Sequence, residues 1–395
     1  MDPAEIAQLR MDIPALRTSC YLNTGTLGLS PRSTSELFFR LCREWQDAGS
    51  GNPRVYEAAA AAAAKAKERI AAFVGATGSE LALTGNTTEG VNIVANGLGL
   101  EPGDEVIISD QEHPAGLLIW LHLRQTTGIR IRIARLSPDD RSRNVEEVEA
   151  LITPRTRLVA LSHISCQTGL RLPAREITET AHARGVPVLL DGAQSVGQFE
   201  VDLGEIGCDY YTLNGHKWLL GPPGTGALYV SSSALRRLVP DRVGGGSAER
   251  WDYAEDGDLV LHDHGGRFEF GTRLFPLYPA WAASLNLLER IGLRAVSERS
   301  LELAQRLRRG LEDIPGVEVL GPTRDPLLMT ALVSCRLRGL TGRKVYETLL
   351  DRFNIVARPV DELDAVRFST AFYNTEEEVD LALRALATLA RDAAA

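Results

Sequence analysis

Short apolar runs alternate with longer amphipathic segments from about residue 80 onward. Continuous apolar runs separated by helix-like segments are typical of βαβ units, which form a mostly parallel sheet covered on both faces. In such sheets, ligands bind at the carboxyl ends of the strands. We therefore predict an α/β fold whose functional residues directly follow its strands. The runs that predict strands are ELALT (80–84), EVIIS (105–109), IRIRIA (129–134), RLVALS (157–162) and VPVLLD (186–191).

The pattern changes near residue 275, where two long helical segments precede shorter strands and further helices. This change predicts a small α+β domain made of residues 1–19 and 276–395, beside a large domain of residues 20–275. The polar, glycine-rich stretch 244–267 is either a loop over the site or a plain surface connection. The alanine run from Ala58 to Ala64 continues into IAAFVG, and we expect a packed helix there rather than a tether.

An acid and a lysine follow neighbouring predicted strands. Asp191 ends VPVLLD, and Lys217 follows the next apolar run in CDYYTLNGHKW. Alone, Asp191 is better explained as a helix cap or turn residue, and Lys217 is either a surface charge on a loop or a buried amine with a chemical role. Because parallel strands end at the same edge of a sheet, we expect the two side chains to lie at one rim.

Two further segments add to this rim. Gly85, Asn86, Thr87 and Thr88 open a helix after a strand, and the free amides and hydroxyls at such a helix start suit a phosphate, although the same residues also serve as ordinary caps. His113 follows the strand EVIIS, where its ring can stack on a flat ligand. A lysine, a carboxylate, a phosphate cradle and a stacking ring are the groups that pyridoxal phosphate (PLP) requires, and the chain is expected to bind this cofactor.

Four motifs together resemble the class V aminotransferase family of fold-type I PLP enzymes: DGAQSVG, YTLNGHKWLLGPPGTG, TGNTTEGVN and FEFGT. The resemblance runs from residue 21 to residue 380. It implies a large domain with a seven-stranded, mostly parallel sheet, a small C-terminal domain, and a homodimer with shared active sites. YLNTGTLGLSPR and GHKWLLGPPGTGALYV are most similar to isopenicillin N epimerase and its relatives, which are often enzymes of specialised metabolism.

The resemblance also implies residue roles. Lys217 forms the Schiff base and moves protons, Asp191 pairs with the pyridine nitrogen, and His113 stacks on the ring. Arg367 binds the substrate carboxylate, which suits its rigid guanidinium fork. Arg358 either binds a second substrate carboxylate or is a solvated charge, and Cys166 either touches substrate or fills space. The cofactor-binding positions implied are Asn86, Thr87, Thr88, His113, Asp191, Gln194, Asn214, His216, Lys217, Gly271 and Thr272.

The positions of the cysteines limit the reactions that we expect. Cysteine desulfurases carry a nucleophilic cysteine on a loop before the R-x-S motif, but residues 352–369, RFNIVARPVDELDAVRFS, contain none. Cys166 stands where those relatives commonly have asparagine. We therefore do not expect desulfurase activity. Epimerase or aminotransferase chemistry at the substrate α-carbon is expected, through an external aldimine and a carbanion or quinonoid, with a C–S β-lyase acting on an S-substituted cysteine as the alternative. Residues that could select among these fates are His163, Arg273, Arg358 and Tyr373.

Composition excludes several other classes. The 395 residues carry a net charge of −9, which argues against nucleic acid or an anionic membrane as a partner. The five cysteines form no CxxC pair, so neither a disulfide framework nor a metal site is expected, and a cytoplasmic location fits best. GPPGTG precedes a strand rather than a helix, which rules against a nicotinamide-binding turn. A non-catalytic binding protein is disfavoured because both the lysine and the aspartate are present.

Overall fold

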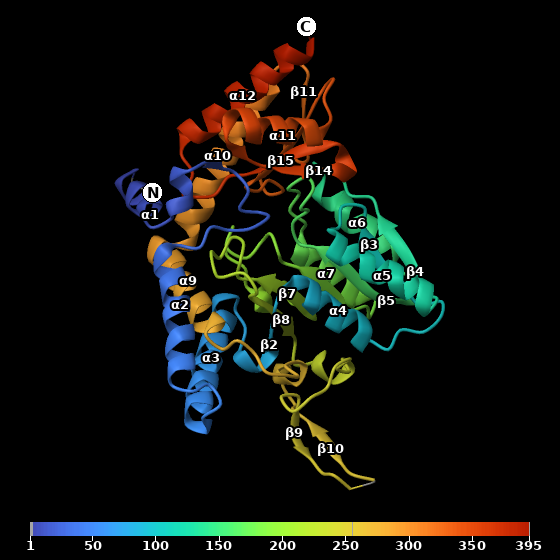
Figure 1. The fold of residues 1–395 in the computed structure, drawn as a ribbon. Coiled ribbons are helices and arrows are strands. Elements are labelled where there is room, and N and C mark those ends of the chain that lie inside the picture. Colours follow the sequence, from blue (N-terminus) through green and yellow to red (C-terminus); the bar gives the residue numbers. More distant parts are fainter. Residues whose placement is uncertain (1–2, 255, 395) are drawn as a thin grey trace.

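The computed structural model describes residues 3–254 and 256–394. Its centre is a seven-stranded sheet of order β2-β8-β7-β6-β5-β3-β4, in which β8 alone runs antiparallel to its neighbours (Figure 1). The expected α/β fold with a mostly parallel sheet is thereby confirmed. The strands are β2 (Leu81–Thr84), β3 (Glu105–Ser109), β4 (Arg130–Ala134), β5 (Thr156–Ser162), β6 (Val188–Asp191), β7 (Tyr210–Asn214) and β8 (Gly226–Val230).

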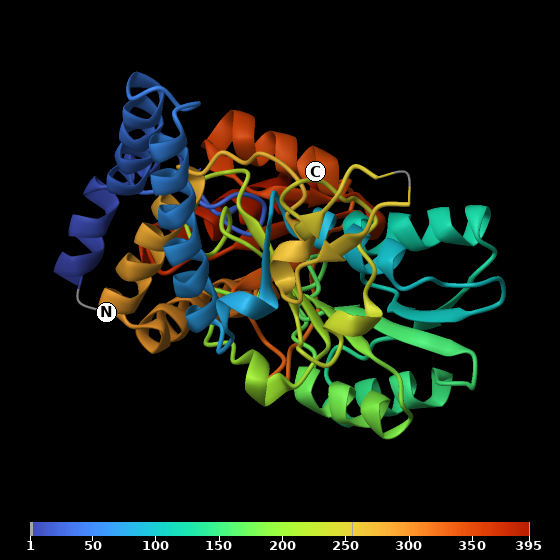
Figure 2. The same ribbon diagram turned by 90° about the horizontal axis from the view of Figure 1, so that it is seen from below.

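Helices cover both faces of this sheet (Figure 2). Side chains alternate between the two faces along each strand, so Leu189 joins the apolar cluster under α4 and α5 while Val188 and Leu190 join the cluster under α7. The same alternation determines on which face of the sheet the side chain of a residue just after a strand lies. The covering helices are α4 (Thr87–Gly97), α5 (Pro114–Thr126), α6 (Arg141–Leu151), α7 (Ala174–Ala183) and the short α8 (Leu203–Ile206).

Three N-terminal helices and α9 form the other flank of the molecule (Figure 1). The alanine-rich run lies in α3, where Ala63 and Ala66 are buried, as a packed helix requires. Asn52 begins α3 by accepting a hydrogen bond from the Arg54 amide at 3.1 Å. Helix α9 packs on α3, although the predicted boundary places it in the small domain. These helices are α1 (Pro3–Met11), α2 (Arg32–Asp47), α3 (Pro53–Phe73) and α9 (Leu277–Ile291).

A second sheet, of order β11-β12-β15-β14, carries its own apolar core beyond one end of the central sheet (Figure 1). The chain near the N-terminus reaches it, because β1 (Cys20–Tyr21) pairs with β13 (Ile355–Val356) and Asn23 pairs with Ser369. The domain boundaries themselves remain a prediction. The remaining elements here are β11 (Val317–Leu320), β12 (Leu332–Leu337), β14 (Arg358–Val360), β15 (Ala365–Ser369), α10 (Leu293–Glu312), α11 (Gly342–Phe353) and α12 (Glu376–Ala394).

The polar stretch 244–267 forms a hairpin of β9 (Ala248–Trp251) and β10 (Leu259–Leu261). Glu255 lies outside the described residues. The hairpin projects away from the second sheet (Figure 1), so within a single chain it does not cover the strand ends. No helix in the described part of the chain is long and apolar enough to span a membrane. Short 3₁₀ turns are η1 (Pro14–Arg17), η2 (Gly78–Glu80), η3 (Leu235–Arg237), η4 (Gly265–Phe268) and η5 (Asp361–Leu363).

Candidate active site

Asp191 and Lys217 meet at the carboxyl edge of the central sheet, as the sequence predicts. Asp191 is buried at the end of β6, and Lys217 follows β7 on the neighbouring strand. Burial lowers the pKa of Lys217 to about 8, and the nearby Asp191 carboxylate opposes that shift. The structure therefore holds a lysine whose neutral, nucleophilic form is accessible near neutral pH.

Burial raises the pKa of Asp191, while the Ala193 amide and the Lys217 ammonium act in the opposite direction. The Ala193 amide donates to Oδ1 of Asp191 at 2.8 Å. This hydrogen bond fixes the carboxylate at the end of β6. A buried carboxylate held this way is suited to pairing with a protonated nitrogen of a bound ligand.

The N-terminal loop packs tightly over the lysine. The Gly28 amide donates to the His216 carbonyl at 2.7 Å, and a Cβ at residue 28 would lie 1.9 Å from the Lys217 carbonyl oxygen. Only glycine permits this approach. The loop thereby fixes the backbone that carries the amine.

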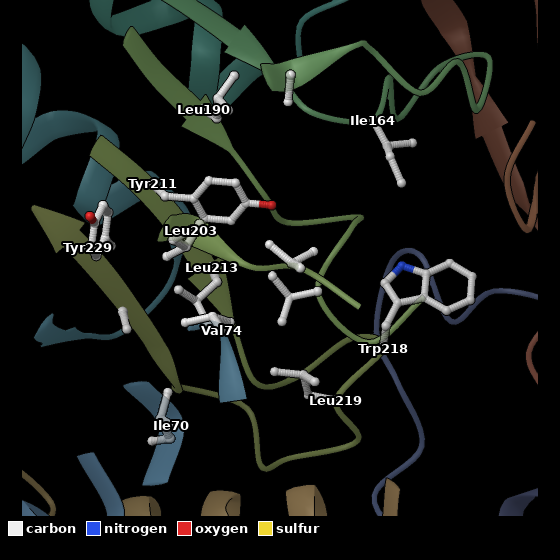
Figure 3. Close-up of a cluster of buried hydrophobic side chains, with 14 of the residues drawn as sticks. Ile70, Val74, Ile164, Leu190, Leu203, Tyr211, Leu213, Trp218, Leu219 and Tyr229 are labelled. Atoms are coloured by element: carbon white, nitrogen blue, oxygen red, sulfur yellow. The ribbon is translucent and has the colours of Figure 1, made fainter. Parts of the chain in front are cut away.

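Gln194 ties the same loop to the segment after Lys217. Its Nε2 donates to the Gly25 carbonyl at 2.7 Å, and its Oε1 accepts from Trp218 Nε1 at 2.9 Å. Trp218 lies beside the N-terminal loop, drawn in blue in Figure 3. These two bonds leave one amide hydrogen of Gln194 for a ligand.

His113 is the N-cap of α5, and its Nδ1 accepts from the Ala115 amide at 3.1 Å. That bond places the ring hydrogen of the neutral imidazole on Nε2. Burial, with contributions from Lys217, Arg358 and Arg367, lowers the pKa of His113 to about 4. The ring is thus neutral at physiological pH, which favours stacking on a flat ligand rather than ion pairing.

The start of α4 forms a cradle of free amides. Asn86 caps the helix by accepting from the Glu89 amide at 2.9 Å, and Glu89 in turn accepts from the Gly85 amide at 2.7 Å. Within the described residues, the amides of Thr87 and Thr88 donate to no acceptor. Free amides at a helix N-terminus suit a phosphate.

His216 and Asn214 lie between this cradle and Lys217 along the chain. Nδ1 of His216 donates to the Thr225 carbonyl at 3.2 Å, and burial lowers the pKa of His216. Its Nε2 is then an acceptor, so contact with a phosphate requires the ring to gain a proton. Asn214 is buried at the end of β7 and lies opposite Gly226 in the register.

Two arginines face the lysine from the second sheet. Arg367 is fully buried, and it donates to the Cys166 carbonyl at 2.7 Å and to Thr26 Oγ1 at 3.1 Å. Its Nε has no partner among the described residues. Burial, and then the charge of Arg358, lower the pKa of Arg367 to about 9. A buried guanidinium with an unused donor indicates a site for an anion.

Cys166 is close enough to Lys217 and Arg367 for their charges to act on its thiol. Burial is the largest influence and raises its pKa, so the thiol stays protonated. A protonated, buried thiol is a poor nucleophile. Cys166 therefore does not replace the mobile cysteine of the desulfurases.

Some predicted residues lie elsewhere in this chain. Gly271 and Thr272 are exposed and make no hydrogen bond with the candidate site, so their role toward a partner subunit remains a prediction. His163 was expected among the groups that select the reaction, but it lies on the opposite face of the sheet, since alternation along β5 turns Ser162 and His163 in opposite directions.

The sequence analysis missed Glu112, the residue before His113. Its buried carboxylate accepts hydrogen bonds from Ser109 Oγ at 2.5 Å and from Ser162 Oγ at 2.6 Å. Ser162 at the end of β5 is the register partner of Asp191 on β6, and Glu112 follows β3 on the other side of β5, so the two acids lie on either side of the end of β5. Burial raises the pKa of Glu112 to about 7. In the sequence, the only indication that Glu112 belongs to the site was its position directly before His113.

The described residues contain no group of three or more His, Cys, Asp or Glu side chains placed to hold a metal ion.

Comparisons with known proteins show the family and the fold of the chain. The Aminotransferase class-V family model matches residues 41–382. A probable cysteine desulfurase of Methanothermobacter thermautotrophicus is 32% identical over 390 residues, covering 94% of this chain and 95% of that protein. An isopenicillin N epimerase of Streptomyces clavuligerus is 35% identical over 340 residues, covering 82% of this chain and 84% of that protein.

Solved structures of C-DES share the fold. The complex of this cystine C-S lyase with its reaction product cysteine persulfide matches with a TM-score of 0.88 at 28% identity, covering 95% of this chain and 99% of that one. A C-DES mutant with glycine covalently linked to its PLP cofactor also gives a TM-score of 0.88 at 28% identity, covering 96% of this chain and 98% of that one.

Proposed function

The chain belongs to the class V aminotransferase family of fold-type I PLP enzymes, and we propose that it removes a proton from the α-carbon of an amino acid, as an epimerase or an aminotransferase does. The observation that carries the proposal is the meeting of Lys217, Asp191 and Arg367 at one rim, without a mobile cysteine. These residues provide a base, a buried carboxylate and a buried arginine with an unused donor, which supports the proposal.

The residues present fit the cofactor. The unbonded amides at the start of α4 would hold its phosphate, with Asn86, His216 and Asn214 nearby. Asp191 would face its pyridine nitrogen, His113 would lie on its ring, and the free amine of Lys217 would attach it. When bound, PLP supplies an electron sink for negative charge at the α-carbon.

The residues of the chain would then bind the substrate, transfer the proton and exclude water. Arg367 would bind the substrate carboxylate, leaving the α-hydrogen to the amine of Lys217. Lys217, whose pKa is lowered to about 8, is matched to accepting and donating a proton near neutral pH. The loop bearing Gly28 would exclude water from this amine. Arg358 would receive a second carboxylate where the substrate has one.

A C–S β-lyase acting on an S-substituted cysteine is the second candidate, favoured by the match to the cystine C-S lyase C-DES. Desulfurase activity is not proposed, despite relatives with that name, because the connection between β14 and β15 is short and contains no cysteine.

Cofactor absorbance during turnover tests the proposal. The protein would be purified with PLP and mixed with amino acids, including S-substituted cysteines, with Lys217→Ala as the control. Accumulation of the amino form of the cofactor identifies an aminotransferase. Return of the aldehyde form with inverted substrate identifies an epimerase, and release of ammonia and a thiol identifies the lyase. If no amino acid changes the spectrum, the proposal is wrong.

A further inference from the structure

A separate cavity of about 400 Å³ lies on the sheet face opposite Asp191. It opens between the start of α7, the segment 199–206 and the loop bearing Leu327 and Leu328. Its volume is within the range of small-molecule sites. None of the predicted cofactor-binding or substrate-binding residues lines it.

His163 lies at the floor of this cavity, with 3% of its surface exposed. Its Nδ1 contacts Tyr211 Oη at 2.9 Å, and Tyr211 Oη contacts Ser195 Oγ at 2.6 Å. Tyr211 itself stands within the apolar cluster of Figure 3.

The proton positions in the hydrogen-bonded series His163–Tyr211–Ser195 follow from those at Ser195. Ser195 Oγ donates to the Gly192 carbonyl at 3.1 Å, so its hydroxyl oxygen accepts from Tyr211. The Tyr211 hydroxyl has no second hydrogen, so His163 Nδ1 must donate to it. Nε2 of His163 is then an acceptor, and it has no partner among the described residues. This acceptor lies in the cavity lining, where a ligand that carries a donor can reach it.

Arg171 adds a positively charged donor to the acceptor that His163 provides. Its guanidinium lies 3.7 Å from the centroid of the Phe199 ring, and within the described residues it has no ion pair and no hydrogen bond through its side chain. The other arginines of the cavity are already paired, Arg141 with Glu176 and Arg175 with Glu179. Arg171 is thus the cation of this cavity that remains available for a ligand carboxylate.

The cavity rim is acidic, because Glu200, Asp202 and Glu205 are exposed there. One available cation facing three carboxylates disfavours a simple anion. The same arrangement favours a ligand that carries an ammonium as well as a carboxylate.

We propose that this cavity binds a free α-amino acid as a zwitterion. The carboxylate of the ligand pairs with Arg171, and its ammonium donates to His163 Nε2 and faces the acidic rim. The site is separate from the PLP site, and the inference does not depend on which reaction occurs there.

Binding stoichiometry tests this proposal on the holoenzyme. The probe is 2-methylalanine, which has both charged groups but no α-proton to lose, followed by the common amino acids in competition. Equilibrium dialysis counts bound molecules, while cofactor absorbance reports the active site alone. We expect a binding event that leaves the cofactor spectrum unchanged, and no such event with acetate or methylammonium.

Variants test whether this binding takes place in the cavity. Arg171→Leu should weaken it at least tenfold with an unchanged cofactor response, whereas Arg175→Leu, in the first turn of α7 and paired with Glu179, should not. Leu327→Trp narrows the exposed mouth without removing a buried contact and should also weaken binding. The proposal is overturned if no spectrally silent event occurs with any amino acid, or if Arg171→Leu and Leu327→Trp both leave it unchanged. A silent cofactor spectrum with every amino acid would instead contradict the proposed reaction.

Discussion

Arg358 on β14 lies directly opposite Arg367 on β15, and among the described residues no carboxylate lies within ion-pair distance of either. Two adjacent cations without an acid repel each other, and the charge of Arg358 adds to burial, which is the larger cause of the lowered pKa of Arg367. A bound carboxylate would relieve that repulsion. We therefore propose that this pair receives the substrate carboxylate.

Arg367→Lys should lower kcat/KM by about 10- to 100-fold, because a hydrogen bond to a charged group contributes about 1.5–3 kcal/mol and lysine lacks the two-pronged geometry. Arg358→Gln should lower kcat/KM only for substrates with a second carboxylate. Steady-state kinetics on paired substrates measures both effects. Arg336→Lys, a partly exposed residue paired with Glu318, is the control. Equal kinetics for Arg367→Lys and the parent enzyme would refute the carboxylate assignment.

Lys217→Ala should reduce turnover by about 10²–10⁴-fold or more, the range of a lost general acid–base group. The fold should survive, because Lys217 makes no ion pair with any described residue. Borohydride reduction followed by peptide mass analysis should find the cofactor attached to the parent chain and not to the variant. Lys65→Ala, on the exposed side of α3, should behave as the parent does. Retained turnover in Lys217→Ala would remove the lysine from the mechanism.

Glu112 predicts a pH-dependent stability difference. Its pKa is raised from 4.5 to about 7 in the folded chain, so between these values the folded state holds a proton that the unfolded state has released. Folding stability from this group is therefore lost as pH rises from 4.5 to 7, by on the order of 3 kcal/mol. Glu112→Gln should lack this loss. Denaturant unfolding of both proteins at several pH values measures the difference, and parallel curves would contradict the prediction.

Gly28→Ala should destabilise the site, since its Cβ would lie 1.9 Å from the Lys217 carbonyl oxygen. Overpacking of this kind costs about 1–3 kcal/mol. We expect a lower unfolding midpoint together with weaker cofactor binding, measured by absorbance titration. Gly51→Ala is the matched control, because nothing lies within 4 Å of its Cβ position. Identical behaviour of the two variants would show that the loop over Lys217 accommodates the added methyl group without loss of stability, which would contradict the prediction.

Incubation with L-cysteine should leave no persulfide on the chain, as judged by intact-mass measurement. The physical reason is that Cys166 is buried and its pKa is raised, so a thiolate is not available. Cys166→Ala should keep turnover within several-fold, as Cys335→Ala should, since Cys335 is buried in the second sheet. A persulfide that disappears in Cys166→Ala alone would restore desulfurase chemistry to the chain.

Much of the fold could be predicted from the sequence because its signals are local. Apolar runs such as VLLD and helical segments such as TTEGVNIVANG need only their own residues to indicate a strand or a helix, and alternation between them dictates a parallel sheet. The same rule placed Asp191 and Lys217 at one rim, because parallel strands end together.

Other features depended on contacts between distant segments. The unpaired arginines, the approach of Gly28 to Lys217 and the burial of Glu112 arise only where loops from different parts of the chain meet. The sequence by itself therefore determined the α/β architecture and the chemical groups at the strand ends. Tertiary structure alone decided which of those groups are desolvated, which are left unpaired, and that His163 faces a second cavity, because burial and pairing are properties of packed neighbours.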